Sequence, residues 1–284
     1  MSVKHSQFNA RRAAGRGFSL LELLVSIGVV SVMMGVLLPA LSGAREAARQ
    51  SECDSNLRQL GVAAHAYADD FRGHMPPGAA DFLQNLSRWH GSRSNPSERF
   101  RAEGGALTEY LGETASGDVL ASPIRRCGSF VPVLRTLADR GTGFELACGG
   151  YGYNNTYVGV QRYQGGGRRG IASDRAGQQL SRFYIPAKTI CFSDTAFASD
   201  AGADDVIEYS FIEPRFWPDS PGSRADPSLH FRHGGTAGIA WLDTHVSRER
   251  MTYSWSSGLF GVDAASVGIG FTGSADDNSL YGEE

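Results

Sequence analysis

The chain has 284 residues, of which 20% are charged and 41% are hydrophobic. This length and composition predict a folded core of moderate size with an appendage. The formal net charge of −3 excludes the strongly basic balance typical of nucleic-acid-binding proteins, so we expect no nucleic-acid partner. Glycine accounts for 36 residues, about 13% against a usual share of ~7%, which favours a body of strands, turns and long loops.

Charge is unevenly distributed between the first 17 residues and the rest of the chain. The leader, residues 1–17, carries Lys4, Arg11, Arg12 and Arg16 and no acidic residue. Because this leader contributes +4 to the total of −3, the remainder has a net charge of −7. A basic flank in front of a hydrophobic segment stays on the cytoplasmic side of a membrane. The acidic body is therefore expected outside the cytoplasm.

An apolar run follows the leader from Phe18 to Leu41 and contains one acidic residue, Glu22. The uncharged residues 23–44 would span ~33 Å as a helix, enough to cross a hydrocarbon core of ~30 Å. A carboxylate in such a segment costs roughly 2.5–3.5 kcal/mol on insertion, so it indicates a function. An ordinary secretory signal does not fit, because the run is too long and no small-x-small cleavage site follows it.

The residues around the start of this run carry a family resemblance. The sequence Gly17-Phe18-Ser19-Leu20-Leu21-Glu22, followed by the apolar run, resembles a type IV prepilin (class III) signal. The resemblance implies that a prepilin peptidase cleaves after Gly17, that the new amine of Phe18 is methylated, and that Glu22 guides assembly. Pro39 stands 22 residues into the mature chain, where family members also carry a proline.

The first helix is expected to continue beyond the membrane. One face of the following segment repeats apolar residues at steps of four and three, which indicates an amphipathic helix. That stripe consists of Cys53, Leu57, Leu60, Ala64, Tyr67 and Phe71. We predict one helix from about Phe18 to Asp70, kinked or locally melted at Pro39 and ended by Gly73 and the Met75–Gly78 segment.

The rest of the chain predicts a small α+β body. Short helices are expected at Asp81–Trp89 and Ala106–Leu111, and β-branched and aromatic runs predict the strands Tyr157–Gln161, Thr189–Ser193, Val206–Ile212, Gly238–Leu242 and His245–Ser247. We therefore expect a pilin-like fold, in which a long N-terminal helix packs on a small antiparallel sheet with long loops. The expected divisions are a leader (1–17), a transmembrane and assembly half-helix (18–44), an amphipathic half-helix (45–72), a globular body (73–261) and a mobile tail rich in glycine and acidic residues (262–284).

A second resemblance lies near the C-terminus. Nine residues separate His233 from Asp243, as in pilin-like proteins with a C-terminal H-x(9)-D-G processing-associated domain. The glycine of that pattern is replaced by Thr244, whose branched side chain disfavours positive φ. We therefore expect a turn other than type I′ between the strands on either side. The structural interpretation is that His233 and Asp243 brace this hairpin.

The same region admits a metal-binding alternative. His230, His233, Asp243 and His245 have H-x2-H and D-x-H spacings that would suit a structural or catalytic metal, whereas strand geometry favours the hairpin. A further hypothesis is a calcium site at Asp200, Asp204 and Asp205, and its alternative is a solvated loop. We expect no cofactor beyond such a structural calcium ion.

The four cysteines are Cys53, Cys127, Cys148 and Cys191. In an exported protein they would meet an oxidising space, where four thiols allow three connectivities. The nearest pair in the sequence, Cys127 and Cys148, is the favoured disulfide. The chain contains no C-x2-C, G-x-S-x-G or H-E-x-x-H motif, so neither a zinc ribbon nor a hydrolase is indicated and we expect no enzyme.

These observations lead to a non-enzymatic pilin-like subunit of a type II secretion pseudopilus or a type IV pilus. The expected location is the inner membrane, crossed once, with the body in the periplasm or in a surface filament. The expected partners are the prepilin peptidase, other pilin-like subunits and the inner-membrane assembly machinery. The alternative is a membrane-anchored binding module that never polymerises, with Tyr151, Tyr153, Tyr157 and Tyr163 either lining a binding face or packing strand edges. A third hypothesis is an exported metal hydrolase using the histidine cluster.

Overall fold

The computed structural model of the protein describes residues 18–112, 122–141, 144–163, 170–220, 222–256 and 261–282. The chain divides into two units, Met1–Arg45 and Glu46–Glu284. The expected leader, including Gly17, lies outside the described residues.

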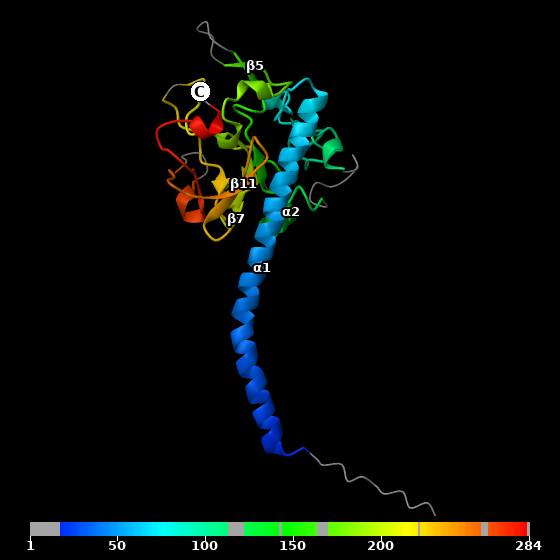
Figure 1. Cartoon of the computed structure of the whole chain (residues 1–284), viewed down its shortest axis with the longest axis vertical. Coiled ribbons are helices and arrows are strands. Elements are labelled where there is room, and N and C mark those ends of the chain that lie inside the picture. Colours follow the sequence, from blue (N-terminus) through cyan, green and yellow to red (C-terminus); the bar gives the residue numbers. More distant parts are fainter. Residues whose placement is uncertain are drawn as a thin grey trace, which may run out of the picture. The chain divides into compact units, whose positions relative to one another are not determined.

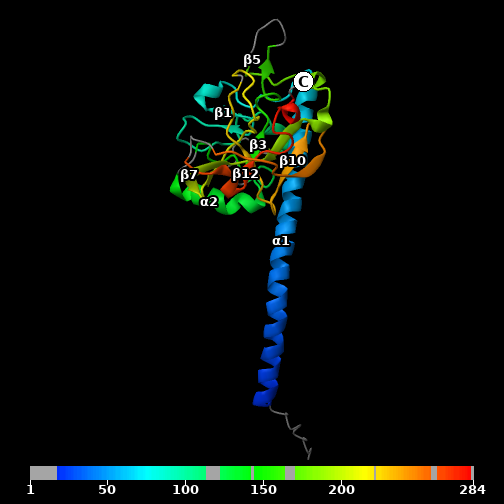
Figure 2. The ribbon, with the colours of Figure 1, turned by 90° about the vertical axis from the view of Figure 1, so that its left-hand side faces the viewer.

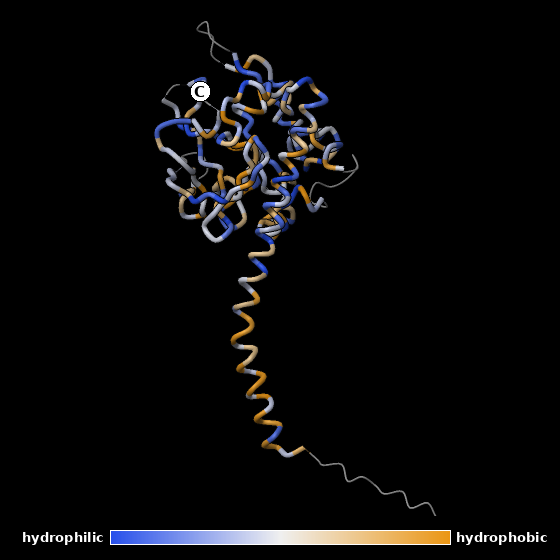
Figure 3. Tube along the Cα trace, in the orientation of Figure 1, coloured by the Kyte–Doolittle hydropathy of each residue, from blue (hydrophilic) through white to orange (hydrophobic). Residues whose placement is uncertain are grey.

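The first unit consists, in its described part, of Phe18, Ser19 and the beginning of helix α1 (Leu20–Asp70). This 51-residue helix starts two residues after the expected position and ends at the expected residue (Figure 1). It remains helical on both sides of Pro39, so the sequence-based expectation of local melting at that proline is wrong. Its first half is predominantly hydrophobic (Figure 3).

The second unit is built around a four-stranded antiparallel sheet with the strand order β11-β10-β6-β3. The strands are β3 (Tyr151–Tyr153), β6 (Ile190–Asp194), β10 (Thr236–Trp241) and β11 (Val246–Arg250). Strands β6 and β10 are buried throughout or nearly so, in keeping with their small and apolar residues, and the charged Asp194 at the end of β6 accepts a hydrogen bond from the N–H of Gly238. Both β10 and β11 lie where the sequence predicts the hairpin.

Shorter elements surround this sheet (Figures 1 and 2). The two-stranded sheets pair β1 (Ser87–Arg88) with β2 (Gly91–Ser92), β4 (Gln161–Arg162) with β5 (Ile171–Ser173), β7 (Phe197–Ala203) with β8 (Val206–Ile207), and β9 (Leu229–His230) with β12 (Ile269–Gly270). Helix α2 spans Val131–Arg140, and single 3-10 turns lie at Phe82–Gln84, Glu109–Leu111, Gly128–Phe130, Leu180–Arg182, Pro186–Lys188, Ala264–Val267 and Ser279–Tyr281. The α+β expectation is thereby confirmed.

The C-terminal part of α1 packs on the sheet through the predicted stripe. Cys53, Leu57, Leu60 and Ala64 are fully buried, whereas Phe71 at the end of the stripe remains 49% exposed. Gly238 in β10 permits the close approach, because a Cβ atom there would lie 2.6 Å from Cδ1 of Leu57. The side chain of His65 reaches the carbonyl oxygen of Leu242 at 2.6 Å, and Arg248 binds Asp54. Helix and hairpin therefore share one core.

A buried ion pair lies elsewhere in this body. Nε of Arg88 donates to Oε1 of Glu145 at 2.6 Å, and both side chains are at most 1% exposed. The other carboxylate oxygen of Glu145 accepts from the backbone N–H of Ser210 at 2.7 Å. The guanidinium of Arg88 also donates to the side chain of Asn85. This pair meets the condition under which buried charges are tolerated, namely extensive hydrogen bonding.

Several local sequence predictions are wrong. The predicted strand Tyr157–Gln161 starts in a stretch of turns and bends, residues 155–160. The carbonyl oxygen of Asn154 accepts from the N–H groups of Val158 and Gly159, and its side-chain Oδ1 accepts from the backbone N–H of Tyr157. The expected helix at Asp81–Trp89 is reduced to one 3-10 turn between two residues with positive φ, Asp81 and Asn85.

Residues 262–284 were expected to be a separate mobile tail, and their described part is instead integrated in the body. Strand β12 pairs with β9, and Tyr281 is completely buried. The side chain of Asn154 donates to the carbonyl oxygen of Tyr281 at 2.8 Å, so the last described turn is tied to the strand region of the core. Burial and hydrogen bonding, more than composition, decide whether a terminus is ordered.

The turn of the β10–β11 hairpin shows which backbone conformation Thr244 adopts in place of the glycine of the C-terminal motif. The N–H of Thr244 donates to the carbonyl oxygen of Trp241 at 2.9 Å, and Thr244 has φ of +74°. Asp243 does not have positive φ, so the turn is not type I′, as expected. Thr244 nevertheless occupies the left-handed conformation that a glycine would adopt easily, so the expectation that threonine avoids positive φ here is wrong.

Candidate functional site

The N-terminal end of α1 forms a reciprocal cap. Oγ of Ser19 accepts from the N–H of Glu22 at 3.2 Å, and Oε2 of Glu22 accepts from the N–H of Ser19 at 2.9 Å and from its hydroxyl at 3.0 Å. This is a capping box, in which a serine before the helix and a glutamate three residues later satisfy each other's backbone donors. The Ser-x-x-Glu spacing is visible in the sequence, and our sequence analysis missed it.

The cap is followed by an apolar surface that none of the described residues covers. An 18-residue window of α1 is long and apolar enough to cross a membrane, and none of it is buried in the structure. Leu20 is 86% and Val36 is 69% exposed. Exposed large side chains on every side of a helix cannot be a stable arrangement in water, so this surface requires lipid or other subunits.

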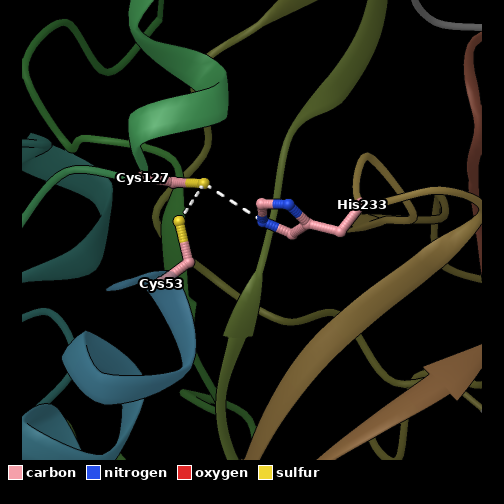
Figure 4. A group of neighbouring side chains, drawn as sticks. All are labelled: Cys53, Cys127 and His233. Carbon is pink, nitrogen blue, oxygen red and sulfur yellow. Dashed lines mark hydrogen bonds between the residues drawn. The ribbon is translucent and has the colours of Figure 1, made fainter. Parts of the chain in front are cut away.

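A second cluster lies inside the second unit, where three potential ligand atoms meet (Figure 4). Sγ of Cys53 and Sγ of Cys127 are 2.7 Å apart, and Sγ of Cys127 is 3.3 Å from Nε2 of His233. All three residues are buried. We call these residues the Cys53–Cys127–His233 cluster.

Charged groups enclose the cluster. Nδ1 of His233 is 3.2 Å from Oε1 of Glu46, and its Nε2 is 3.6 Å from Oδ2 of Asp194. Nε of Arg232 lies 3.9 Å from the other oxygen of Asp194. The side chains of His233 and Asp194 are at most 1% exposed, while that of Glu46 is 40% exposed. The imidazole therefore has a carboxylate beside each of its ring nitrogens.

These surroundings set the protonation states. Burial opposes the charged imidazole, but Asp194 and the neighbouring Cys53 outweigh it and raise the pKa of His233 to about 10. Burial also opposes the ionised Asp194, yet Arg232 and His233 keep the pKa of that carboxyl below its usual value. Contact with Cys127 lowers the pKa of Cys53, whereas burial raises that of Cys127. At neutral pH, His233 is therefore a cation and Asp194 an anion.

Each member of the cluster is positioned by a different local structure. Cys53 belongs to the predicted stripe of α1, and Cys127 precedes the 3-10 turn that leads into α2. His233 stands before the pair Gly234 and Gly235, both with positive φ, and its backbone exchanges two hydrogen bonds of 3.1 Å with Thr236. Their proximity could not be predicted from the sequence, because Cys53 and His233 are 180 positions apart.

The four residues of the predicted metal site do not converge. His233 belongs to the cluster described above, while Asp243 accepts from Nδ1 of His245 at 2.6 Å on the surface. His230 is packed against the ring of Phe130. Asp243 also accepts from the N–H of His245, so it stabilises the hairpin turn. Asp243 therefore makes a contact that stabilises the hairpin, as predicted. The side chain of His233 does not, because it contacts Cys127, Glu46 and Asp194 on other elements.

The predicted disulfide between Cys127 and Cys148 does not agree with the structure. Cys127 contacts Cys53, not Cys148. Cys148 and Cys191 are both completely or almost completely buried. The residues of the calcium hypothesis lie in and beside the β7–β8 turn, where Asp204 and Asp205 have positive φ. Among the described residues, the group whose potential ligand atoms converge is the Cys53–Cys127–His233 cluster and not these aspartates.

A cavity of about 630 Å³ opens on another part of the body. Its apolar wall includes Phe82, Ile171 and Trp217. Glu213 is one of the residues that line the cavity, and burial raises the pKa of its carboxyl to about 7 despite the hydrogen bond from the hydroxyl of Tyr209. Of the tyrosines considered from the sequence, Tyr151, Tyr153 and Tyr157 are buried packing residues and Tyr163 is half exposed.

Comparisons with known families agree with the N-terminal geometry. Residues 12–38 match the prokaryotic N-terminal methylation motif. Residues 42–114 match a family described as a protein of unknown function (DUF1559). No curated protein and no solved structure matches the chain. The chain therefore carries a prepilin-type methylation motif, and the segment that follows it matches a family with no assigned activity.

Proposed function

We propose that the protein is a structural, non-enzymatic subunit that a prepilin peptidase cleaves after Gly17 and methylates at Phe18. It then assembles through α1 into a pseudopilus or pilus of the type II secretion or type IV pilus kind. The observation that carries this proposal is the single carboxylate, Glu22, at the start of an otherwise apolar and uncovered helix surface, within the matched methylation motif. The scattering of His230, His233 and Asp243 supports a role without metal catalysis.

Membrane insertion precedes assembly in this proposal. The apolar part of α1 crosses the inner membrane once, the basic leader stays in the cytoplasm, and the second unit lies in the periplasm. The inner-membrane assembly machinery would extract the subunit from this state. Apolar side chains such as Leu20 and Val36 then exchange lipid for the helices of neighbouring subunits. Because lipid and neighbouring helices are equally apolar, how well the side chains pack decides which surroundings are favoured.

Glu22 acts as a register check during that exchange. In the single chain its carboxylate is occupied by the backbone and side chain of Ser19. On assembly, the methylated amine of Phe18 in an adjacent subunit would pair with it. Taking charges out of water is favourable only when the pair is well formed, so a subunit in the wrong register leaves an uncompensated charge.

Cleavage is tested first by mass spectrometry of the mature N-terminus. We expect a chain that begins at Phe18 and carries one methyl group. An intact Met1 or cleavage after the apolar run would refute processing by a prepilin peptidase.

Assembly is tested by crosslinking through a Val25→Cys substitution in the apolar helix. Glu22→Ala and Glu22→Gln should both insert normally and both lose crosslinked oligomers, because neither carries the negative charge that an ion pair with the amine requires. Glu22→Gln is the matched control, since its amide oxygen can still accept from Ser19 and preserve the cap. Oligomers at the normal level in either variant would contradict the role of the carboxylate.

The second candidate function is a membrane-anchored binding module that does not polymerise, and the cavity beside Trp217 favours it. Its size lies within the range of small-molecule sites, about 300–1,000 Å³. This function predicts processed but monomeric chains in the crosslinking experiment. It also predicts that Trp217→Ala abolishes ligand-induced thermal shifts in a screen of the purified full-length chain.

A further inference from the structure

We infer that Cys53 and Cys127 form a disulfide that joins α1 to the segment preceding α2 in the mature protein. The inference rests on the proposed location of the body outside the cytoplasm, where disulfides form and persist. The distance is the first argument. Unbonded heavy atoms prefer separations of about 3.5–4.0 Å, so two sulfurs at 2.7 Å are closer than a pair of separate thiols would remain.

Charge balance is the second argument. Glu46 and Asp194 contribute two negative charges around the cluster, and Arg232 and His233 contribute two positive charges. A disulfide adds no charge to this balanced group. The lowered pKa of Cys53 makes its thiolate the competing state, and that thiolate would add a third negative charge among fully buried sulfurs, which is costly without a further cation.

The histidine provides the third argument, since its environment opposes metal binding. A tetrahedral zinc site with Zn–S distances of about 2.3 Å would hold the sulfurs roughly 3.8 Å apart, wider than they are here. It would also require a neutral imidazole with a free lone pair. Both ring nitrogens of His233 instead face carboxylates, Glu46 on one side and Asp194 on the other, which favours a proton on each nitrogen.

The bond forms by thiol–disulfide exchange with a disulfide donor, either a periplasmic dithiol oxidase or oxidised glutathione. The thiolate of Cys53 attacks the donor disulfide and forms a mixed disulfide, releasing one donor thiol. The thiolate of Cys127 then attacks Sγ of Cys53 and releases the second donor thiol. The donor thus takes up two electrons and two protons, which the cysteines lose. The cation of His233 beside Cys127 stabilises the second thiolate.

Burial determines when this exchange happens. Both Cys53 and Cys127 have no exposed surface in the folded body, so a donor reaches Cys53 only before α1 docks onto the sheet, and Cys127 attacks as docking brings the two sulfurs together. The same burial protects the finished bond. The folded chain should therefore keep its disulfide in a reductant that removes it completely once a denaturant is added.

The test uses the full-length chain, extracted from membranes in detergent after its free thiols have been blocked. After denaturation without reductant, we expect two alkylated cysteines, Cys148 and Cys191, and a disulfide-linked pair of peptides containing Cys53 and Cys127. Cys53→Ser should expose one further thiol, at Cys127. Cys148→Ser is the matched control, because it removes a buried cysteine and should leave the linked pair intact.

Three results would overturn the inference alone. They are four free thiols in a chain whose body is digested by protease added to spheroplasts, a linked pair of Cys127 and Cys148, and stoichiometric zinc that is lost in Cys53→Ser. Four free thiols in a chain whose body is protected from that protease would overturn both the proposed location and the disulfide. The protease assay thereby separates failure of the inference from failure of the proposed function.

Discussion

The two parts of α1 place apolar residues in opposite surroundings. In the first unit large side chains such as Leu20 and Val36 are exposed, at 86% and 69%. In the second unit smaller residues, including Ala64 and Ala68, are buried with Leu57 and Leu60 against the sheet. Hydrophobicity alone therefore does not indicate burial within the chain. A narrow stripe with small residues indicates packing on the same chain, whereas apolar residues on all sides indicate lipid or other subunits.

The largest expected effect tests this comparison at two neighbouring positions of the second unit. Leu60→Asp places a charge in the fully buried stripe, and we expect it to cost at least about 4 kcal/mol of unfolding free energy. Val62→Asp, two residues away and 54% exposed, should change stability by less than about 0.5 kcal/mol. Urea unfolding of the purified chains, followed by near-UV circular dichroism, measures both. Equal losses would show that the stripe does not define the packed face.

The next effect compares a buried with an exposed ion pair. Removing Glu145 by substitution with alanine leaves Arg88 uncompensated in the core and should cost about 3 kcal/mol or more. Arg248→Ala removes a partly exposed pair with Asp54, for which we expect less than about 1 kcal/mol. The same unfolding experiment provides the two values. A loss of similar size at both pairs would contradict the distinction between core and surface.

A smaller effect concerns the pH dependence of the second unit. With Cys53 and Cys127 reduced, Asp194 and Cys53 raise the pKa of His233 to about 10 from an ordinary value of 6.5, so its proton stabilises the folded state. This contribution is fully present below pH 6.5 and is lost as pH rises towards 10. Melting temperatures measured across this window should fall with pH. His233→Gln should melt lower near pH 6 and show a flatter decline, and an unchanged slope would exclude His233 as the titrating group.

The smallest effect concerns the cap of the first unit. Ser19→Ala removes one half of the capping box, with an expected cost of about 1 kcal/mol in local helix stability. Assembly should be slowed without being lost, because Glu22 retains its charge. Crosslinking yield over time measures this. Ser42→Ala is a suitable control, since its hydroxyl donates to the carbonyl oxygen of Leu38 within the same helix and takes no part in the cap.

The long helix and the main hairpin could be predicted because their signals are local. The stripe from Cys53 to Ala64 has the helical period, and β10 is a short, mostly apolar run that ends at a turn. Helix α2 also has local signals that the sequence analysis did not use. Pro132 lies in its first turn, and Gly141 follows it with positive φ.

Other features depended on contacts that no local pattern encodes. The segment around Tyr157 has strand-forming residues, yet Asn154 captures its backbone N–H groups in a turn. Position 244 must adopt positive φ because the hairpin requires it, whatever residue stands there. The pairing of Cys53 with Cys127 and His233 arises only after the helix docks onto the sheet. Sequence proximity therefore favoured the wrong disulfide partner.

The docking of α1 also determines how the second unit would respond to a mechanical load. The buried residues from Cys53 to Ala68 lie along the helix axis, with lateral contacts from Asp54 to Arg248 and from His65 to Leu242. A pull along this axis loads these contacts in shear, so they must slip together, whereas a pull across it would peel them one after another. A helix anchored in this way is suited to carrying axial tension into the body.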